Sequence, residues 1–309
     1  MDNTDKKRTA GIIVAASHKG KLRPLLQMGS ISVIKRIVLT YQHAGVSPIV
    51  VITGHQAGDI EHELADYNII FLHNPDYEET DMFSSAKIGL EFLQDKCEQI
   101  IFTPVHIPMF SPDTIRRLMA SGEALISPSY RKKAGHPLLL SADFIPQILE
   151  YQGNQGLRGA IDTLGIKRKY MEVEDACVLH NMDELEQMDE LIKQHNEYIL
   201  HPFLKISIEK EKLFFNSRTK FLLILIQETG SVKSACKHMA LSYSNAWNML
   251  NELEKELGYA VIKRRRGGKY GGKTDLTAEG IDFLEKYQEF EVGVRQYARE
   301  AFARIFQRK

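Results

Sequence analysis

TGSVKSACKHMALSYSNAWNMLNELEKELGYAVIKRRRGGKYGGKTDLTAEG, residues 229–280, combines two short helical patterns with a basic, glycine-rich segment. Ser231 can cap a helix, because a serine oxygen accepts hydrogen bonds from the first backbone N–H groups of a helix. Apolar residues then recur at helical spacing: Val232, Ala235 and Met239. The pattern predicts a first short helix that ends near Met239.

A second helix is predicted after the turn at Ala240 and Leu241. Ser242 offers another cap, and Gly258 is a typical helix stop. Between them runs an apolar stripe of Ala246, Leu250, Leu253 and Leu257. Two short helices across a tight turn predict a helix-turn-helix, a motif that binds DNA.

The front of the second helix carries uncharged polar and aromatic residues that suit contacts in a DNA major groove. We assign DNA contacts to Ser242, Tyr243, Ser244, Asn245 and Asn248. Trp247, on the same helix, is predicted to belong to the core rather than to stack on bases.

Positive charge is concentrated just behind this helix. Six cations lie within eleven residues: Lys263, Arg264, Arg265, Arg266, Lys269 and Lys273. Gly267, Gly268, Gly271 and Gly272 lie among them and suit a hairpin tip. An isolated run of charge is usually a solvated face. Here strand-like pieces flank the run, at residues 260–262 and 274–276, and together they predict a DNA-binding wing. The cations of this wing are predicted to contact phosphates, and they include Arg264, Arg265, Arg266, Lys269 and Lys273.

Residues 204–290 resemble the N-terminal DNA-binding domain of the ModE family of molybdate-responsive regulators. The matching pieces are GS at 230–231, SYxxAW at 242–247, ELG at 256–258, the GGxxGG wing at 267–272 and LTxEG at 276–280. The resemblance implies a winged helix-turn-helix, related to that of LysR-type regulators, which binds DNA as a dimer. We expect no molybdate-binding domain after it, and the helical spacing of residues 289–309 predicts a helix that pairs with a second copy.

Length, cysteine content and hydropathy limit the remaining possibilities. A chain of 309 residues is long enough for two domains. Cys97, Cys177 and Cys236 are far apart and odd in number, which disfavours a disulfide framework and favours reduced thiols in a cytoplasm. We expect neither a transmembrane span nor a signal peptide.

Charge divides unevenly along the chain. Residues 204–309 hold 20 Lys and Arg against 13 Asp and Glu, a net charge of +7, so the neutral whole leaves −7 for the preceding part. A basic module joined to an acidic one suits DNA binding by the C-terminal part alone. We expect a boundary near residues 201–202, after a helix-like segment at 183–199, and domains at 1–203 and 204–309.

The first two hundred residues predict an α/β domain with a doubly wound, mostly parallel sheet. Strand-like runs at residues 12–16, 48–53, 69–72 and 99–103 alternate with helix-like segments at 32–44 and 84–93. In such sheets ligands bind at the carboxyl ends of the strands. The loops after residues 16, 53, 72 and 103 are therefore the expected site.

Residues 11–200 resemble the MobA-like nucleotidyltransferases, especially the molybdenum cofactor cytidylyltransferase branch. VAASHKGKLRPLL at 14–26 matches that family's opening LAAGxSxRMGxxKxLL, although Ser17 replaces the first glycine and Arg23 the lysine. Further matches are NPDY at 74–77, Met82 with SS at 84–85 and GL at 89–90, SPDT at 111–114 and GHP at 135–137.

The resemblance implies nucleotidyl transfer, in which carboxylates hold Mg²⁺ against a triphosphate. His106 stands where the family carries a metal-binding Asp, and Asn181 replaces the first carboxylate of an Asp-x-Asp pattern that ends at Asp183. An imidazole is a poor ligand for a hard cation. We therefore expect a catalytically degenerate domain without a certain cofactor. A softer metal bound by His106 with His73 or His136 is the less favoured alternative.

A pocket that has lost its catalytic groups can still bind a nucleotide or pterin and act as an effector domain for a dimeric DNA reader. The expected ligand-binding residues are Ala15, Ala16, Ser17, Arg23, Asn74, Ser84, His106, His136 and Asp183. Two alternatives remain open. One is an active, Mg²⁺-dependent nucleotidyltransferase with an attached regulatory domain, and the other is a domain that only brings two DNA-binding heads together.

Overall fold

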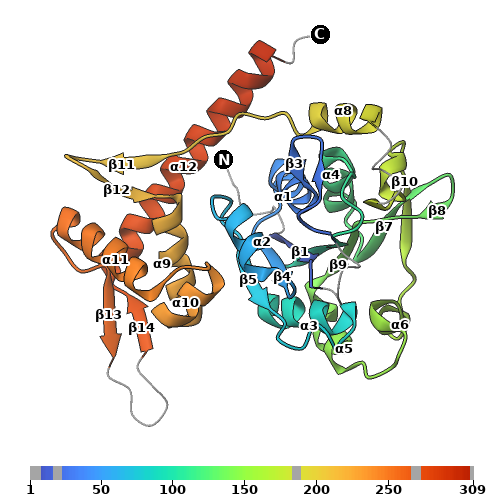
Figure 1. The fold of residues 1–309 in the computed structure, drawn as a ribbon, viewed down its shortest axis with the longest axis horizontal. Coiled ribbons are helices and arrows are strands. Elements are labelled where there is room, and N and C mark those ends of the chain that lie inside the picture. The colour runs from blue at the N-terminus through green and yellow to red at the C-terminus, as the bar shows by residue number, and fades with distance from the viewer. Residues whose placement is uncertain (1–7, 17–22, 183–188, 266–272, 307–309) are drawn as a thin grey trace. The chain divides into compact units, whose positions relative to one another are not determined.

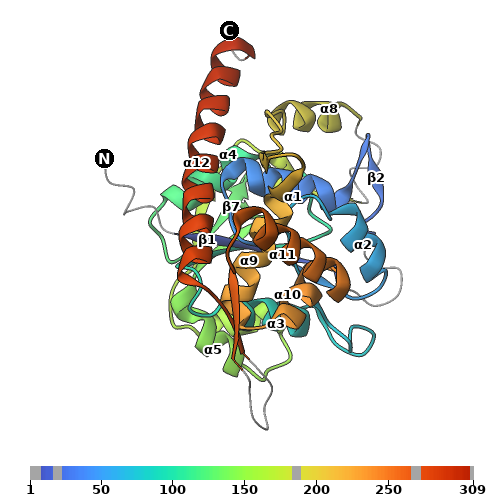
Figure 2. The same cartoon turned by 90° about the vertical axis from the view of Figure 1, so that its left-hand side faces the viewer.

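A computed structural model describes residues 8–16, 23–182, 189–265 and 273–306 of the chain. It divides into two compact units, Met1–Leu200 and His201–Lys309. Each unit has its own buried core, and each is described by itself below (Figures 1 and 2).

The first unit is built on an eight-stranded sheet in the order β10-β7-β9-β6-β1-β4-β5, with β8 paired to β7. Its strands are β1 (Thr9–Val14), β4 (Ile49–Thr53), β5 (Ile70–His73), β6 (Gln99–Pro104), β7 (Leu125–Tyr130), β8 (Lys133–Ala134), β9 (Leu138–Ser141) and β10 (Lys169–Glu172). A separate hairpin joins β2 (Gln27–Met28) to β3 (Ile31–Ser32). The central strands β6, β1, β4 and β5 run parallel, and β9 runs antiparallel to both β6 and β7.

Helices cover both faces of this sheet (Figure 1). They are α1 (Val33–Ala44), α2 (Ala57–Glu63), α3 (Met82–Leu93), α4 (Pro112–Ala120), α5 (Ile145–Glu150), α6 (Gly156–Asp162) and α8 (Asp189–Tyr198). Helix α1 contacts α4, whereas α3 contacts β1 and β4 together with α5 and α6. The doubly wound, mostly parallel fold expected from the sequence is confirmed.

Local signals explain where these helices begin and end. The Ser32 side chain accepts the Lys35 N–H at the start of α1, and Gly45 ends that helix with a left-handed φ of 90°. Strand β1 starts at Thr9, three residues before the expected strand, because Thr9 still pairs with Gln99 of β6. The strand ends at Val14, so Ala15 and Ala16 lie beyond it in the loop.

Close packing of α1 on β1 depends on a glycine. The Tyr41 ring is fully buried, and a Cβ at Gly11 would lie 2.6 Å from it. A side chain at this position would separate α1 from the sheet. Gly11 therefore allows the first helix to cover the central strand.

The second unit is a winged helix-turn-helix. Its elements are β11 (Ser207–Glu209), β12 (Leu213–Asn216), α9 (Ser217–Thr229), α10 (Val232–His238), α11 (Tyr243–Leu257), β13 (Ile262–Arg265), β14 (Lys273–Leu276) and α12 (Ala278–Phe306). The predicted caps are confirmed, since Ser231 and Ser242 accept N–H groups of Ser234 and Asn245 at 3.2 Å. Gly258 ends α11 with a φ of 79°.

The core of this unit joins the first hairpin to α12. Phe215 meets Phe283 and Tyr287 edge-on, with ring centroids 4.9 and 4.7 Å apart. The Tyr287 hydroxyl donates to the Ile206 carbonyl at 2.7 Å. These contacts hold the first third of α12 in the body of the unit.

Two predictions in this unit need correction. The first wing strand is β13, at Ile262–Arg265, rather than residues 260–262, because the Glu254 carboxylate already binds the N–H groups of Val261 and Ile262. The helix expected at residues 289–309 is the second half of one continuous helix, α12, which begins at Ala278 and has 29 residues. Among the described residues, no helix is both long and apolar enough to cross a membrane.

Within the first unit, a buried guanidinium on α1 connects α8 to the rest of the core. Arg36 is fully buried and donates to His195 Nδ1 at 3.0 Å, to Asn196 Oδ1 at 2.9 Å and to the Met28 carbonyl at 2.6 Å. His195 Nε2 lies 3.2 Å from the Phe110 carbonyl. Because Nδ1 faces a cation and Nε2 faces a carbonyl, the neutral ring with its proton on Nε2 satisfies both contacts. Burial, and then the Arg36 charge, lower the pKa of His195 to about 4.

The low pKa of His195 predicts acid sensitivity of the first unit. The unfolded chain, with an ordinary histidine pKa of 6.5, binds more protons than the folded chain between about pH 6.5 and pH 4. The stability that depends on neutral His195 is therefore complete above pH 6.5 and is lost as the pH falls toward 4. In the variant His195→Gln, whose amide can accept from Arg36 and donate to Phe110, this loss should shrink by up to about 3 kcal/mol.

Urea unfolding between pH 4 and pH 7.5 measures the effect. His62→Gln, at an exposed histidine of α2, controls for the removal of one imidazole. If the free energy of unfolding depends on pH equally in the wild type and in His195→Gln, the assignment of a neutral, buried His195 ring is contradicted.

Candidate functional site

The carboxyl ends of β1, β4, β5 and β6 form one edge of the first unit. Backbone hydrogen bonds connect them: the Ala15 N–H donates to the Ile52 carbonyl at 2.9 Å, and the Val105 N–H donates to the Val14 carbonyl at 3.2 Å. The Asn74 N–H continues the series to the Thr53 carbonyl at 2.9 Å. From β1 the chain continues to β4, which lies on one side of β1, and it later forms β6 on the other side. The strand order therefore reverses at β1, and ligands bind at such a point in doubly wound sheets.

A buried hydroxyl lies at this edge. Thr53 is fully buried at the end of β4, and its Oγ1 has no hydrogen-bond partner in the described part of the chain. The backbone beside it is tightly enclosed, since a Cβ on Gly54 would lie 2.7 Å from Tyr77 and 3.2 Å from Ala16. An unsatisfied buried hydroxyl costs stability, and at a strand end it can serve as a contact for a ligand.

Asn74 and Ser84 organise the loop between β5 and α3. The Asn74 amide donates to Thr80 and Ser85 at 3.0 and 2.9 Å and accepts the Asp76 N–H at 3.0 Å. The Ser84 N–H and hydroxyl both donate to the Asp81 carboxylate at 2.8 Å. These contacts use both amide donors of Asn74 and place a negative cap at the start of α3, so neither residue is poised to bind an anion.

His106, His136 and Arg168 form a second group beside the strand ends. Burial, and then the charges of Arg168 and His106, lower the pKa of His136 to about 4. His136 Nδ1 is buried and has no hydrogen-bond partner among the described residues. The Arg168 guanidinium donates from Nε and Nη2 to the Ser127 hydroxyl. The group is rich in nitrogen donors.

These residues do not fit a hard divalent cation such as Mg²⁺, which prefers several oxygen ligands. Within the described ranges, no three His, Cys, Asp or Glu side chains gather in a way that could hold a metal ion. Of the other expected ligand-binding residues, Ala15 and Ala16 are buried at the strand ends and Arg23 is exposed. Ser17 and Asp183 lie outside the described residues.

The second unit presents the front of α11 on its surface. Ser242 is occupied as the helix cap, and its Oγ also lies 3.3 Å from the Ser244 hydroxyl. Tyr243 is 54% exposed, and Ser244, Asn245 and Asn248 are exposed as well. All five predicted contact residues are therefore exposed, and the four on α11 have side chains that do not serve as its cap.

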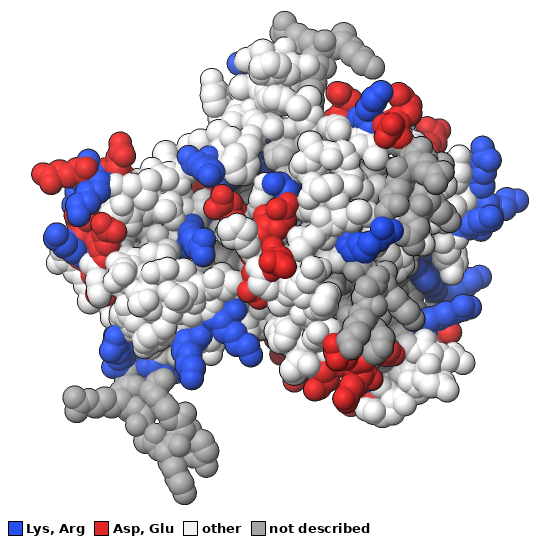
Figure 3. Space-filling model, viewed as in Figure 1, with Lys and Arg blue, Asp and Glu red and all other residues white. Residues whose placement is uncertain are grey.

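The β13–β14 ribbon carries positive charge next to this helix. Lys and Arg side chains gather at the end of the unit from which the ribbon projects (Figure 3). Lys273 is exposed and pairs with Asp275 of the same strand at 3.0 Å. Arg266 and Lys269 lie outside the described residues, as does the side chain of Arg265.

Arg264 makes a contact that the sequence did not reveal. Its guanidinium carbon lies 3.8 Å from the centre of the Trp247 ring, and the Tyr243 ring meets Trp247 edge-on at 5.9 Å. The prediction of a core position for Trp247 is corrected, since this side chain is only half-buried. Thr53 and Arg168 were also missed: a buried hydroxyl on a strand leaves no periodic signal, and an arginine before a strand resembles any surface cation.

Two family models match the chain. The MobA-like NTP transferase domain matches residues 11–169, and the bacterial regulatory helix-turn-helix protein of the lysR family matches residues 221–281. The NTP transferase model covers the candidate site at the strand ends of the first unit, except for residues after β10. The helix-turn-helix model covers α10, α11 and the β13–β14 ribbon.

Similar proteins of known name match the C-terminal region. Transcriptional regulator ModE from Haemophilus influenzae is 37% identical over 86 residues, which cover 26% of this chain and 34% of that protein. The DNA-binding transcriptional dual regulator ModE from Escherichia coli K12 is 33% identical over 78 residues, 25% of this chain and 30% of that protein. The chain thus spans about a third of the length of these curated relatives.

Solved structures match the first unit. A nucleotidyl transferase from Methanothermobacter superposes with a TM-score of 0.53 at 19% identity, covering 60% of this chain and 98% of that one. Rv0371c from Mycobacterium tuberculosis gives a TM-score of 0.51 at 18% identity with the same coverage. At such identities the likeness establishes a nucleotidyltransferase-like fold and nothing further.

Proposed function

The chain belongs to the family of MobA-like NTP transferase domains, and on that premise we propose that it is a DNA-binding transcriptional regulator linked to molybdenum metabolism. The observation that carries the proposal is the presence, in one chain, of this fold and of a winged helix-turn-helix with an exposed recognition helix. ModE regulators, and the molybdenum-pterin-binding protein MopB of Rhodobacter capsulatus at 36% identity over 73 residues, support the molybdenum link. We assign residues 1–203 to an effector domain and residues 204–309 to DNA binding.

The effector domain senses a nucleotide or pterin without consuming it. His106 at the end of β6 and the lack of a metal-binding cluster among the described residues support a loss of catalysis. The unsatisfied Thr53 hydroxyl supports a retained ligand contact. A ligand that favours one arrangement of two DNA-binding heads changes operator affinity by its difference in affinity for the two arrangements.

Thermal unfolding of the full chain with CTP, GTP or a pterin, each with and without Mg²⁺, tests the sensor. A bound metabolite should raise the Tm without being consumed. The variant Thr53→Val keeps the side-chain shape and removes a buried hydroxyl, so the ligand-free Tm should stay or rise while the ligand-induced shift shrinks. A nucleotide that is consumed would establish the active transferase instead, and no shift with any compound would favour a domain that only joins two DNA-binding heads.

Two substitutions test the DNA-binding surface by separating phosphate contacts from base contacts. Arg265→Ala should weaken binding to all duplexes by a similar factor and reduce the salt slope by about one. Asn245→Ala should remove about 1–3 kcal/mol of the binding free energy that discriminates between bases at one base-pair position, so that the sequence preference relaxes there. Duplexes selected from a random pool by the wild type, titrated at several salt concentrations, provide the measurement.

Lys286→Ala is the matched control for charge, because Lys286 is an exposed cation on α12 that pairs with Asp282. It should leave DNA binding close to that of the wild type. If Arg265→Ala and Asn245→Ala reduce discrimination between duplex sequences to the same extent, the division into phosphate and base contacts is wrong.

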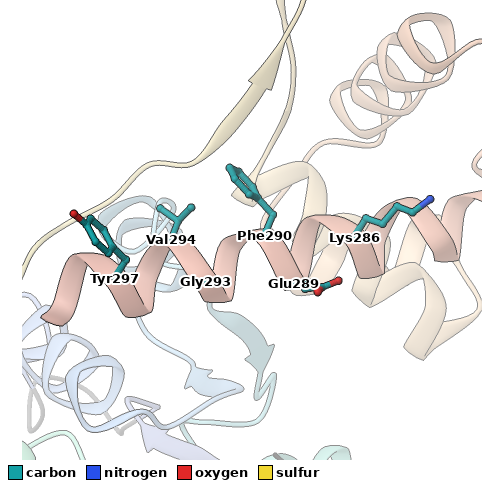
Figure 4. Close-up of a pocket in the computed structure, with 6 residues that line it drawn as sticks. All are labelled: Lys286, Glu289, Phe290, Gly293, Val294 and Tyr297. Carbon is teal, nitrogen blue, oxygen red and sulfur yellow. The ribbon is translucent and has the colours of Figure 1, made fainter. Parts of the chain in front are cut away.

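A second copy of the chain is the proposed partner of α12. Apolar residues follow one another along this helix at spacings of four, three, four and four: Phe290, Val294, Tyr297, Ala301 and Ile305. Phe290, Val294 and Tyr297 project from the same side of α12 (Figure 4). Tyr297 and Ile305 are 69% and 64% exposed, and a continuous apolar stripe of this kind is typical of a helix-pairing surface.

Tyr297→Glu should convert a dimer to a monomer, because it places a charge in the middle of the stripe. Sedimentation equilibrium of the wild type and the variant measures the change. Gln296→Glu adds the same charge at the neighbouring exposed position outside the stripe and should leave the dimer intact. A monomeric wild type, or equal behaviour of the two variants, would contradict pairing through this stripe.

A further inference from the structure

The only tryptophan of the chain lies on the recognition helix and contacts the first strand of the wing. Trp247 belongs to α11, and the Arg264 guanidinium of β13 covers its ring with 3.8 Å from Cζ to the ring centre. The Tyr243 ring also meets Trp247 edge-on, with ring centroids 5.9 Å apart and an interplanar angle of 74°. We call these three side chains the Tyr243–Trp247–Arg264 column.

In the described part of the chain, the column is one of two side-chain contacts that link residues 261–265 to α11. The other is Glu254, whose carboxylate accepts the Val261 and Ile262 N–H groups at 2.8 and 3.2 Å. Trp247 precedes Glu254 by two helical turns, so the two contacts lie about 10 Å apart along the helix. The ribbon is also held through β14, where the Thr274 N–H donates to the Gly230 carbonyl at 2.8 Å, so the column adds to this backbone contact in fixing the direction of the ribbon against α11.

Arg264 has the chemistry for this role. In the described part of the chain no carboxylate pairs with it, in contrast to Lys273, which pairs with Asp275. A planar guanidinium stacks on an aromatic face and keeps its N–H edge available, which a lysine ammonium cannot reproduce. The neighbouring cation on the strand, Lys263, is exposed and points to the opposite side of the ribbon, because successive strand side chains alternate.

We propose that Arg264 is a positioning residue which acts through Trp247 to set the angle of the wing against the recognition helix. The wing cations and the front of α11 then reach the phosphates and the bases of the same duplex together. Arg264 therefore contributes to discrimination between sequences, and not only to general affinity. This inference rests on the proposed DNA binding.

A double-mutant cycle on the full chain tests the proposal. Arg264→Ala, Trp247→Leu and the double variant are titrated against a duplex selected by the wild type and against a random duplex. Each single variant should lose about two- to fivefold affinity for the selected duplex, and less for the random one, as expected for a cation–π contact whose Arg264 side is exposed. The double variant should bind like either single variant, because the two residues act as one unit.

Conservative variants and a control complete the design. Trp247→Phe should restore much of the discrimination because it keeps an aromatic face, whereas Arg264→Lys should not. Lys263→Ala should lower affinity for both duplexes by the same factor. Tryptophan emission of the DNA-free protein should change in Arg264→Ala and stay unchanged in Lys263→Ala, and thermal unfolding confirms that each variant folds.

Two results would overturn the inference while leaving DNA binding intact. One is additive loss in the double variant, and the other is wild-type discrimination in Arg264→Lys, since either would make Arg264 an independent phosphate contact. A wild type that binds no duplex would remove the proposed function itself. Should Trp247→Leu fail to fold, the comparison of Arg264→Ala and Arg264→Lys with the wild type decides, since wild-type discrimination in Arg264→Lys overturns the inference.

Discussion

Strand β1 pairs in parallel with β4 on one side and with β6 on the other, and the first unit depends on this arrangement. Because the chain continues from β1 to β4 on one side and later forms β6 on the other side, the carboxyl ends of these three strands meet at the edge where such sheets bind ligands. The same pairing buries β1 completely and brings Tyr41 of α1 onto Gly11. The residues at the strand ends are thus positioned by backbone hydrogen bonds and not by the loops that follow.

Much of this architecture could be predicted from the sequence, because its signals are local. Apolar runs marked the central strands, helical periodicity marked α1, and capping serines marked the starts of α10 and α11. Strand β9 was harder to foresee, since its antiparallel pairing with β6 and β7 depends on contacts between distant parts of the chain. The start of β13 was displaced for a similar reason: the Glu254 carboxylate captures the backbone just before it.

The candidate sites were less predictable than the fold. Residue type and a family motif pointed to Asn74 and Ser84, whose donors are instead engaged within their own loop. The contacts that distinguish the sites, such as the unsatisfied Thr53 hydroxyl and the stacking of Arg264 on Trp247, depend on side-chain direction in three dimensions. A sequence pattern identifies neither.

The continuity of α12 has a mechanical consequence. The helix begins beside the wing, where a Cβ on Gly280 would lie 2.3 Å from the Val261 carbonyl oxygen, and it extends 29 residues, or about 40 Å. No proline interrupts it, and Glu291 binds Lys220 of α9 and Arg295 to hold its middle in place. Such a helix is expected to move as one rigid rod. In the proposed dimer, the direction of α12 would therefore set the distance between the two wings.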